Sequence, residues 1–270
     1  MFDNYKEFEE IVNEKTEGNE IDLRNLKLNP TTTLPLLCRC KNKDLKFNGK
    51  SAYEYLNNIL KKDIMFSNLP ESRTESEELD FITNYMENLD SRYGSYFALR
   101  HIISELANNV YDHARFENNN LQSYIYSKLH PHYEKLEICM VDDGLSIPGL
   151  FERCNVDFHD DCHAIEQAIG TFSTVSDEFF ERGNGLRTIV RLIGEGNCGE
   201  ILIVSRKGTL HIFGENYTYY LLDDEHKFNG TLVAVMLNKY EIQNIYNLLE
   251  PQKLNYYKYN GVNYDNQDKG

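Results

Sequence analysis

The sequence has no apolar run long enough to cross a membrane. Its longest runs, such as Leu232 to Leu237, fall far short of the roughly 20 residues that a spanning helix needs. The first ten residues, MFDNYKEFEE, also lack the basic segment followed by an apolar core that marks a secretory signal. We therefore expect a cytoplasmic protein with no membrane partner.

Basic side chains are few, because 28 Lys and Arg stand against 43 Asp and Glu and give a formal net charge of -15. Such a field repels nucleic acid backbones and anionic lipids at long range, so we expect neither as a partner. Disulfide bonds are not needed, since a chain of 270 residues can bury a sizeable core. We expect reduced thiols at the six scattered cysteines, which are Cys38, Cys40, Cys139, Cys154, Cys162 and Cys198.

A charged stretch, PESRTESEE at residues 70–78, divides the chain. It is nearly free of apolar side chains, as a linker or exposed loop would be. We therefore expect a small α/β unit at residues 1–75 and a main domain at residues 76–245. Residues 246–270 are polar and irregular, which is typical of a C-terminal tail.

The pattern in the main domain predicts helices covering one face of a largely antiparallel sheet, an α/β fold. Residues 79–114 read as helical, and one apolar stripe of this region contains Leu99, Ile102, Ile103, Leu106 and Val110. Residues 160–193 read as two further helical pieces. Strands are predicted at residues 121–129, 135–141, 200–206, 209–213, 217–222 and 231–237.

The first motif with chemical potential is Glu105-Leu-Ala-Asn-Asn-Val-Tyr-Asp-His-Ala114, which lies inside the predicted helix. Glu105, Asn109 and Asp112 fall within about 60° of one another on a helical projection. An amide oxygen could hold magnesium there, while a carboxylate orients a water molecule. A solvated polar helix face is the alternative, because Glu and Asn one turn apart are common.

The second motif, Asp142-Asp-Gly144-Leu-Ser146-Ile147-Pro148, directly follows an apolar strand. An aspartate at a strand end, with a glycine close behind it, suits a carboxylate that accepts a hydrogen bond from a base amino group. The alternative is an ordinary turn, where Asp and Gly are both favoured.

The third motif is Arg182-Gly183-Asn184-Gly185-Leu186, which leads into a predicted helix. Small residues at a helix N-terminus expose backbone N–H groups, and the helix dipole attracts anions such as phosphate. A helix-entry turn without a ligand would explain the same glycines.

Together, in this order, the three motifs make the chain resemble the GHKL superfamily of gyrase, heat-shock chaperone, histidine kinase and mismatch-repair ATPases. Glu105 to Ala114 resembles the N box, Asp142 to Pro148 the G1 box and Gly183 to Leu186 the G2 box, while Gly230-Thr231 resembles the closing Gly-Thr strand. The resemblance covers about residues 95–240. It implies a Bergerat-type two-layer sandwich with a mostly antiparallel mixed sheet.

The resemblance also implies roles for single residues in binding ATP and magnesium. Asp142 would accept a hydrogen bond from the adenine amino group, Asn109 would ligate magnesium, and Glu105 would be the general base. The remaining residues that it places at the nucleotide are Asp112, His113, Gly144, Ser146, Ile147, Gly183, Asn184, Gly185, Leu186 and Thr231. Ser146 departs from the glycine usual in the family, and the G2 loop has a single Gly-x-Gly.

The N-terminal unit resembles the STAS-like units of anti-sigma antagonists in three stretches. These are Ile21-Asp-Leu-Arg24, Pro30 with the predicted helix from Thr32 to Cys40, and the segment Tyr53 to Leu60. A strand is predicted at Leu45 to Phe47, and Ser51 is a candidate cap for a helix that contains the third segment. Fusion of such a unit to an anti-sigma type ATPase implies partner switching with a regulatory protein. The sequence leaves open whether the chain forms a homodimer.

Two functions from different classes follow from these observations. One is an enzyme that hydrolyses ATP or phosphorylates a protein on Ser or Thr, which Glu105 favours. The other is a non-catalytic nucleotide sensor, which the altered glycines favour. A histidine autokinase is disfavoured, since no dimerisation hairpin with an acceptor histidine is evident upstream.

Two further features have plain structural interpretations. Zinc could be held by Cys154, His159, Cys162 and His163, but their spacing fits no common zinc module. His101 lies one turn before Glu105, and we interpret it as a partly buried structural histidine.

Overall fold

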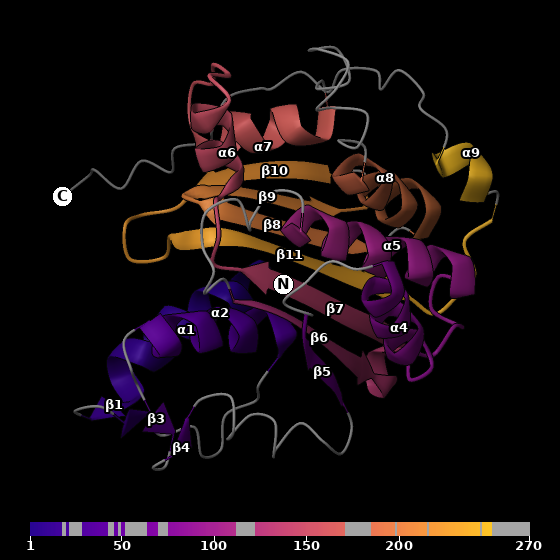
Figure 1. The fold of residues 1–270 in the computed structure, drawn as a ribbon, viewed down its shortest axis with the longest axis horizontal. Coiled ribbons are helices and arrows are strands. Elements are labelled where there is room, and N and C mark those ends of the chain that lie inside the picture. Colours follow the sequence, from indigo (N-terminus) through magenta and orange to yellow (C-terminus); the bar gives the residue numbers. More distant parts are fainter. Residues whose placement is uncertain are drawn as a thin grey trace.

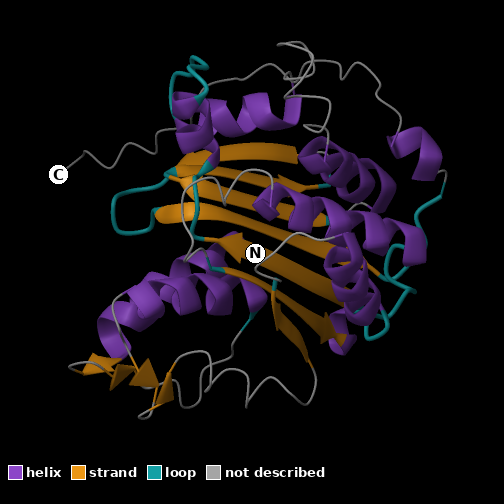
Figure 2. Cartoon of the chain, in the orientation of Figure 1, coloured by secondary structure: helices purple, strands orange, loops and turns teal. Residues whose placement is uncertain are grey.

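The computed structural model describes residues 1–17, 20–21, 29–42, 46–47, 50–51, 64–69, 75–111, 122–170, 185–197, 199–214, 216–243 and 245–249. These residues form one large sheet with helices on both of its faces, and a small four-stranded sheet beside it (Figures 1 and 2). Within the described ranges, no helix combines the length and the apolar character needed to span a bilayer.

The large sheet has seven strands in the order β10-β9-β8-β11-β7-β6-β5. Among the residues that the structure describes, all its neighbouring strands are antiparallel, so the expected antiparallel character is confirmed and the expected mixture with parallel pairs is not found there. The strands are β5 (Ile64–Asn68), β6 (Ser123–His130), β7 (Lys135–Asp142), β8 (Glu200–Arg206), β9 (Gly208–Phe213), β10 (Asn216–Leu221) and β11 (Phe228–Asn238). The strands predicted in the main domain are thus confirmed to within a few residues.

One face of this sheet carries the helices of the main domain. They are α4 (Glu75–Met86), α5 (Tyr96–Asn109), α6 (Ile147–Arg153), α7 (Asp161–Gly170), α8 (Gly185–Arg191), which runs into a π-helical turn (Leu192–Asn197), and α9 (Ile245–Leu249). The predicted stripe from Leu99 to Val110 is buried, and it packs against strand residues such as Ile138, Met140 and Val233.

The single helical region predicted at residues 79–114 is two helices. α4 ends at Met86, and Gly94 and Ser95, directly before α5, both have positive φ, 89° and 104°, which a continuous helix does not allow. The Ser95 side chain then accepts a hydrogen bond from the Ala98 backbone N–H and caps α5. Described helical geometry ends at Tyr111, and Asp112 to Ala114 lie outside the described residues.

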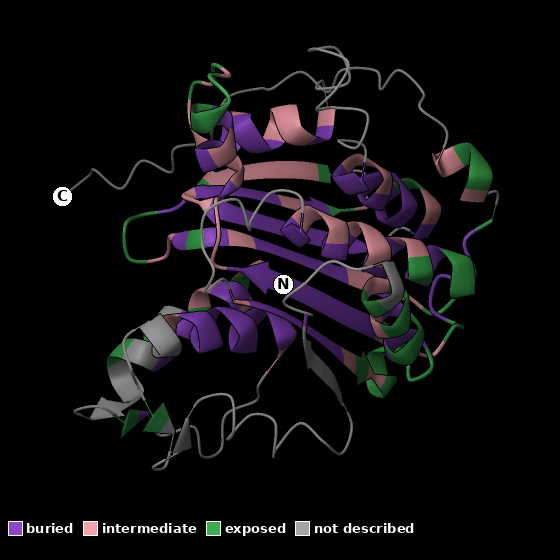
Figure 3. Ribbon diagram, in the orientation of Figure 1, coloured by how far each residue is buried: buried purple, intermediate pink, exposed green. Residues whose placement is uncertain are grey.

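The opposite face of the sheet is covered by α1 (Phe2–Lys15) and α2 (Pro30–Asn42). Their side chains form a second buried cluster with alternate residues of the central strands, such as Cys139, Val141 and Leu232. Figure 3 shows that the central strands are buried along most of their length, as expected for strands covered on both faces. The described chain therefore has three layers where two were expected. Coverage of both faces explains why β7 and β11 read as nearly continuous apolar runs.

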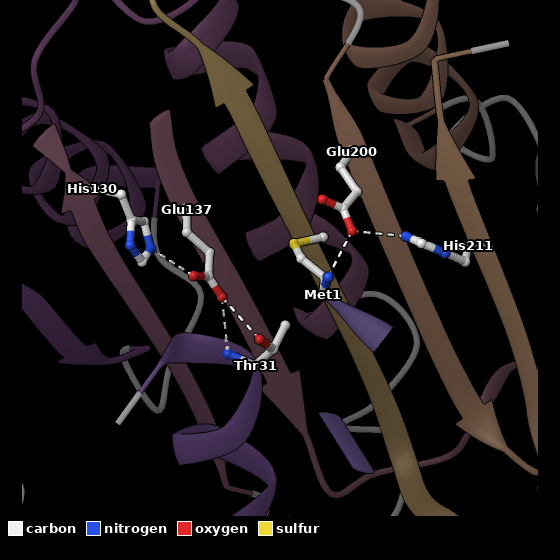
Figure 4. Close-up of polar contacts among 6 residues, drawn as sticks. All are labelled: Met1, Thr31, His130, Glu137, Glu200 and His211. Atoms are coloured by element: carbon white, nitrogen blue, oxygen red, sulfur yellow. Dashed lines mark hydrogen bonds and ion pairs between the residues drawn. The ribbon is translucent and has the colours of Figure 1, made fainter. Parts of the chain in front are cut away.

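Two carboxylates from the sheet hold α1 and α2 in place (Figure 4). Glu137 of β7 is fully buried and accepts hydrogen bonds from the Thr31 backbone N–H (3.2 Å) and hydroxyl (2.9 Å), while its other oxygen lies 2.8 Å from His130 Nε2. Glu200 of β8 accepts from the Met1 ammonium at 2.7 Å and lies 2.8 Å from His211. Burial raises the pKa of Glu200, but these hydrogen bonds outweigh it and leave the pKa at about 2.

The N-terminal residues share this sheet with the main domain. β5 pairs with β6, so a strand that precedes the charged stretch at 70–78 extends the main sheet. The helix predicted at Thr32 to Cys40 is confirmed by α2. The small sheet contains β1 (Thr16–Glu17), β2 (Glu20–Ile21), β3 (Lys46–Phe47) and β4 (Lys50–Ser51). Residues 22–28, the segment from 52 to 63 and residues 250–270 of the predicted tail lie outside the described residues. Residues 246–249, which were also expected to be irregular tail, are helical in α9, and Leu248 and Leu249 pack against the main core.

Candidate functional site

A row of three polar side chains lies near one end of the three central strands β7, β11 and β8. Thr231 of β11 pairs with Asp142 of β7 on one side and with Ser205 of β8 on the other. Alternation along each strand puts them on the same face as Met140, Val233 and Ile203, which belong to the core beneath α5 and α8. On the face covered by α5 and α8, the apolar surface of the sheet therefore ends in this row of polar side chains.

Hydrogen bonds fix this row to the loop that follows β7. The Ser205 hydroxyl donates to the Gly230 carbonyl oxygen at 3.0 Å and lies 3.2 Å from the Thr231 hydroxyl. It also accepts from the Ile147 backbone N–H at 2.8 Å. Ser205 is fully buried, and it ties three separate segments together around Asp142.

Asp142 is a buried carboxyl group, with only 6% of the residue exposed. Its Oδ1 accepts a hydrogen bond from the Gly144 backbone N–H at 3.0 Å. Burial raises the pKa of Asp142 to about 7, although backbone N–H groups of Gly144 and Thr231 favour the ionised form. A buried carboxyl group whose pKa lies near neutral pH is typical of binding and catalytic sites.

Gly230 has no room for a side chain. A Cβ there would overlap the Asp142 carbonyl oxygen and lie 2.9 Å from the Asp143 Cα. Its φ of 134° also lies in the range that other residues rarely adopt. The predicted Gly230-Thr231 element is therefore explained by close passage of β11 past the carboxyl end of β7.

Ser146 has a defined structural role. Its hydroxyl accepts a hydrogen bond from the Gly149 backbone N–H at 3.1 Å and caps α6. The residue is buried, so its hydroxyl is engaged at the helix terminus. Ile147 follows in the first turn of α6 and packs partly against the main core. Ser146 therefore begins a helix directly after the Asp142 loop.

The direction of α5 places its last turns toward the Asp142 end of the sheet. Gly94, just before α5, exchanges backbone hydrogen bonds with Tyr240 and Ile242, where β11 has ended. β7 begins at the same edge, because Lys135 pairs with Asn238. The 14 residues of α5 extend roughly 20 Å, and the eight of β7 extend roughly 25 Å. Figure 1 shows α5 running in the same direction as β7, so its last turns lie toward the end of the sheet where β7 ends in Asp142.

Glu105 also contacts the beginning of α8. A Cβ at Gly185 would overlap Glu105 Oε2, so the first residue of α8 packs directly against this carboxylate. One turn earlier on α5, His101 Nε2 lies 2.7 Å from the Thr188 hydroxyl of α8. The structure therefore brings Glu105 of the first motif against Gly185 of the third.

The remaining predicted residues differ in what the structure describes of them. Asn109 is half-buried and is the last residue of α5. The Leu186 side chain belongs to the main core, which leaves only its backbone for a ligand. Residues 112, 113, 183 and 184, which are Asp112, His113, Gly183 and Asn184, lie outside the described residues.

Three of the four candidate zinc residues are engaged in other contacts. The Cys162 thiol is buried and donates to the Tyr220 carbonyl oxygen at 3.1 Å. The rings of His159 and His163 stack at 4.5 Å, and Cys154 is exposed. Among the residues that the structure describes, no group of three or more His, Cys, Asp or Glu side chains is arranged to hold a metal ion.

Two residues of the site were missed by the sequence analysis. Ser205 follows Ile201 and Ile203 on alternate positions of β8, so a count along the strand would have placed a polar side chain on the inward face. Thr188 carries no comparable signal, because its contact with His101 joins residues 87 positions apart.

Neither a scan against models of known protein families nor a search of curated proteins finds a match for this chain.

Proposed function

We propose that this chain binds ATP with magnesium between the polar row and the helices α5 and α8, and that it acts as a GHKL-type regulatory ATPase or protein Ser/Thr kinase. One observation carries the proposal. Buried Asp142 ends the strand face that α5 and α8 cover, and Glu105 of α5 packs against Gly185, the first residue of α8.

The environment of Asp142 supports recognition of an adenine base. The carboxyl group is buried beside a fixed loop, and its Oδ1 already accepts one backbone hydrogen bond. A carboxylate oxygen has further acceptor capacity, which suits the exocyclic amino group of adenine. Thr231, on the neighbouring strand, adds a hydroxyl to the same face.

The helix pair supports binding of the phosphates and magnesium. Gly185 begins α8, and its missing side chain allows the close approach to Glu105. The amide oxygen of Asn109 is a hard ligand of the kind that magnesium prefers, and bound phosphates would complete the coordination. Bound ATP supplies the γ-phosphoryl group. Glu105 would accept the proton of the attacking water or hydroxyl group.

The enzyme and the sensor differ at Glu105, so one substitution separates them. In the enzyme, Glu105→Gln removes the base and lowers phosphate release by about 100-fold or more, while calorimetry still detects binding of ATP with magnesium. Glu87→Gln, which changes an exposed carboxylate after α4, is the matched control and should leave the rate unchanged. If the natural chain binds ATP tightly without releasing phosphate or labelling a protein, the sensor is correct. Absence of ATP binding would refute both.

A regulatory protein partner belongs to this proposal. The proposal takes residues 1–75 as the regulatory unit, and α1 and α2 of this unit lie on the sheet face opposite the candidate site. Transfer of labelled phosphate from ATP to a Ser or Thr of a co-purifying protein would support the kinase form. Release of phosphate without labelling would support the ATPase form.

A further inference from the structure

His101 links the candidate base to the helix proposed to bind phosphate. Its Nδ1 lies 3.9 Å from Glu105 Oε1, and its Nε2 lies 2.7 Å from the Thr188 hydroxyl. The Thr188 hydroxyl in turn donates to the Gly185 carbonyl oxygen at 2.8 Å. Gly185 packs against Glu105 Oε2, which closes a ring of four residues between α5 and α8.

The hydrogen bonds define which imidazole nitrogen carries the proton. A hydroxyl group has one hydrogen, and that of Thr188 is engaged with the Gly185 carbonyl oxygen. The Thr188 oxygen must therefore accept from His101, so Nε2 carries the hydrogen and Nδ1 keeps its lone pair. Burial lowers the pKa of His101, which favours this neutral form.

We propose that His101 is a positioning residue, which fixes Glu105 relative to the first turn of α8 through its hydrogen bond to Thr188. One oxygen of Glu105 faces the imidazole and the other faces Gly185. His101 and Glu105 lie one turn apart on α5, so the hydrogen bond to Thr188 holds this part of α5 against α8 and keeps Glu105 beside Gly185. The inference rests on the proposed function, since it assigns Glu105 as the base.

Imidazole NMR tests the ring of contacts without any nucleotide. In protein labelled with 15N at histidine, long-range 1H–15N correlations distinguish the two tautomers of His101. We expect the Nε2–H tautomer in the natural chain, and a changed Nε2 shift in Thr188→Val, which keeps the shape of the side chain but removes the hydroxyl. An Nδ1–H tautomer, or shifts that Thr188→Val leaves unaltered, would overturn the inference even if ATP binds.

Kinetics then test the role in catalysis. We expect Thr188→Val to lower the rate of phosphate release by about tenfold or more, because misplacing a catalytic group by about 1 Å can cost up to about 100-fold. Thr188→Ser retains the hydroxyl and should restore the rate to within about twofold, and both variants should bind ATP with magnesium as the natural chain does. Equal rates in the two variants, or a natural chain that binds ATP without turnover, contradict a positioning role. A natural chain that binds no ATP instead refutes the proposed function.

Discussion

Replacing Asp142 by Asn should stabilise the nucleotide-free protein, and more so as the pH rises. Burial raises the pKa of Asp142 to about 7 from an ordinary value of 3.8. Between these values the folded chain keeps a proton that the unfolded chain has released, so its free energy of unfolding falls as the pH rises from about 4 to about 7. An asparagine cannot ionise, and its amide oxygen can still accept from the Gly144 N–H.

The size of the effect follows from the shift. A difference of about 3 pH units corresponds to about 4 kcal/mol when the carboxyl is ionised in both states. Part of this difference has already developed at about pH 5, so the advantage of Asp142→Asn should grow by about 2 to 3 kcal/mol between about pH 5 and about pH 8. The natural chain thus loses stability as the pH rises, whereas a carboxylate held by a salt bridge makes a protein more stable as the pH rises.

Urea unfolding at a series of pH values measures this difference directly, because the midpoint and slope give the free energy of unfolding. Asp157→Asn is the matched control, since Asp157 is exposed and its substitution should give no comparable pH dependence. If the stability difference between the natural chain and Asp142→Asn stays constant from about pH 5 to about pH 8, Asp142 is not the buried, proton-retaining carboxyl on which the site depends.

Two further predictions concern the helix pair. Asn109→Ala should weaken ATP binding in the presence of magnesium and leave the magnesium-free affinity unchanged, and equal losses in both titrations would remove the metal role. Gly185→Ala should lower the free energy of unfolding by about 1 to 3 kcal/mol, because the added Cβ overlaps Glu105. In Gly170→Ala the Cβ meets no described atom within 4 Å, so its stability should be unchanged or raised by up to about 1 kcal/mol. Equal effects of the two alanines in thermal unfolding would contradict the close packing of α5 on α8.

The elements of the main domain could be predicted because their signals are local. The stripe from Leu99 to Val110 repeats with the helical period, and the central strands are apolar runs of strand length. The break at Gly94-Ser95 was missed because apolar residues continue on both sides of it. The resemblance alone assigned both Thr231 and Asp142 to the nucleotide, and the register of β11 against β7 makes the two residues neighbours.

The third layer could not be predicted from the composition of its segment. Residues 1–20 are polar and acidic on average, yet Tyr5, Phe8 and Ile11 repeat every three residues and form the buried side of α1. Which face of the sheet α1 covers depends on contacts with residues far along the chain, such as the hydrogen bond from the Tyr5 hydroxyl to the His226 carbonyl oxygen at 2.6 Å. Such contacts have no local signature.

Recognition of the adenine base by Asp142 is the contact on which the proposed function depends most directly. Calorimetric titration of the natural chain with ATP, and with inosine triphosphate as the matched ligand that lacks the 6-amino group, measures this contribution. We expect ATP to bind and inosine triphosphate to bind about tenfold or more weakly, because a hydrogen bond to a charged group contributes about 1.5 to 3 kcal/mol. Equal affinity for the two nucleotides, or no binding of ATP, would contradict the central claim.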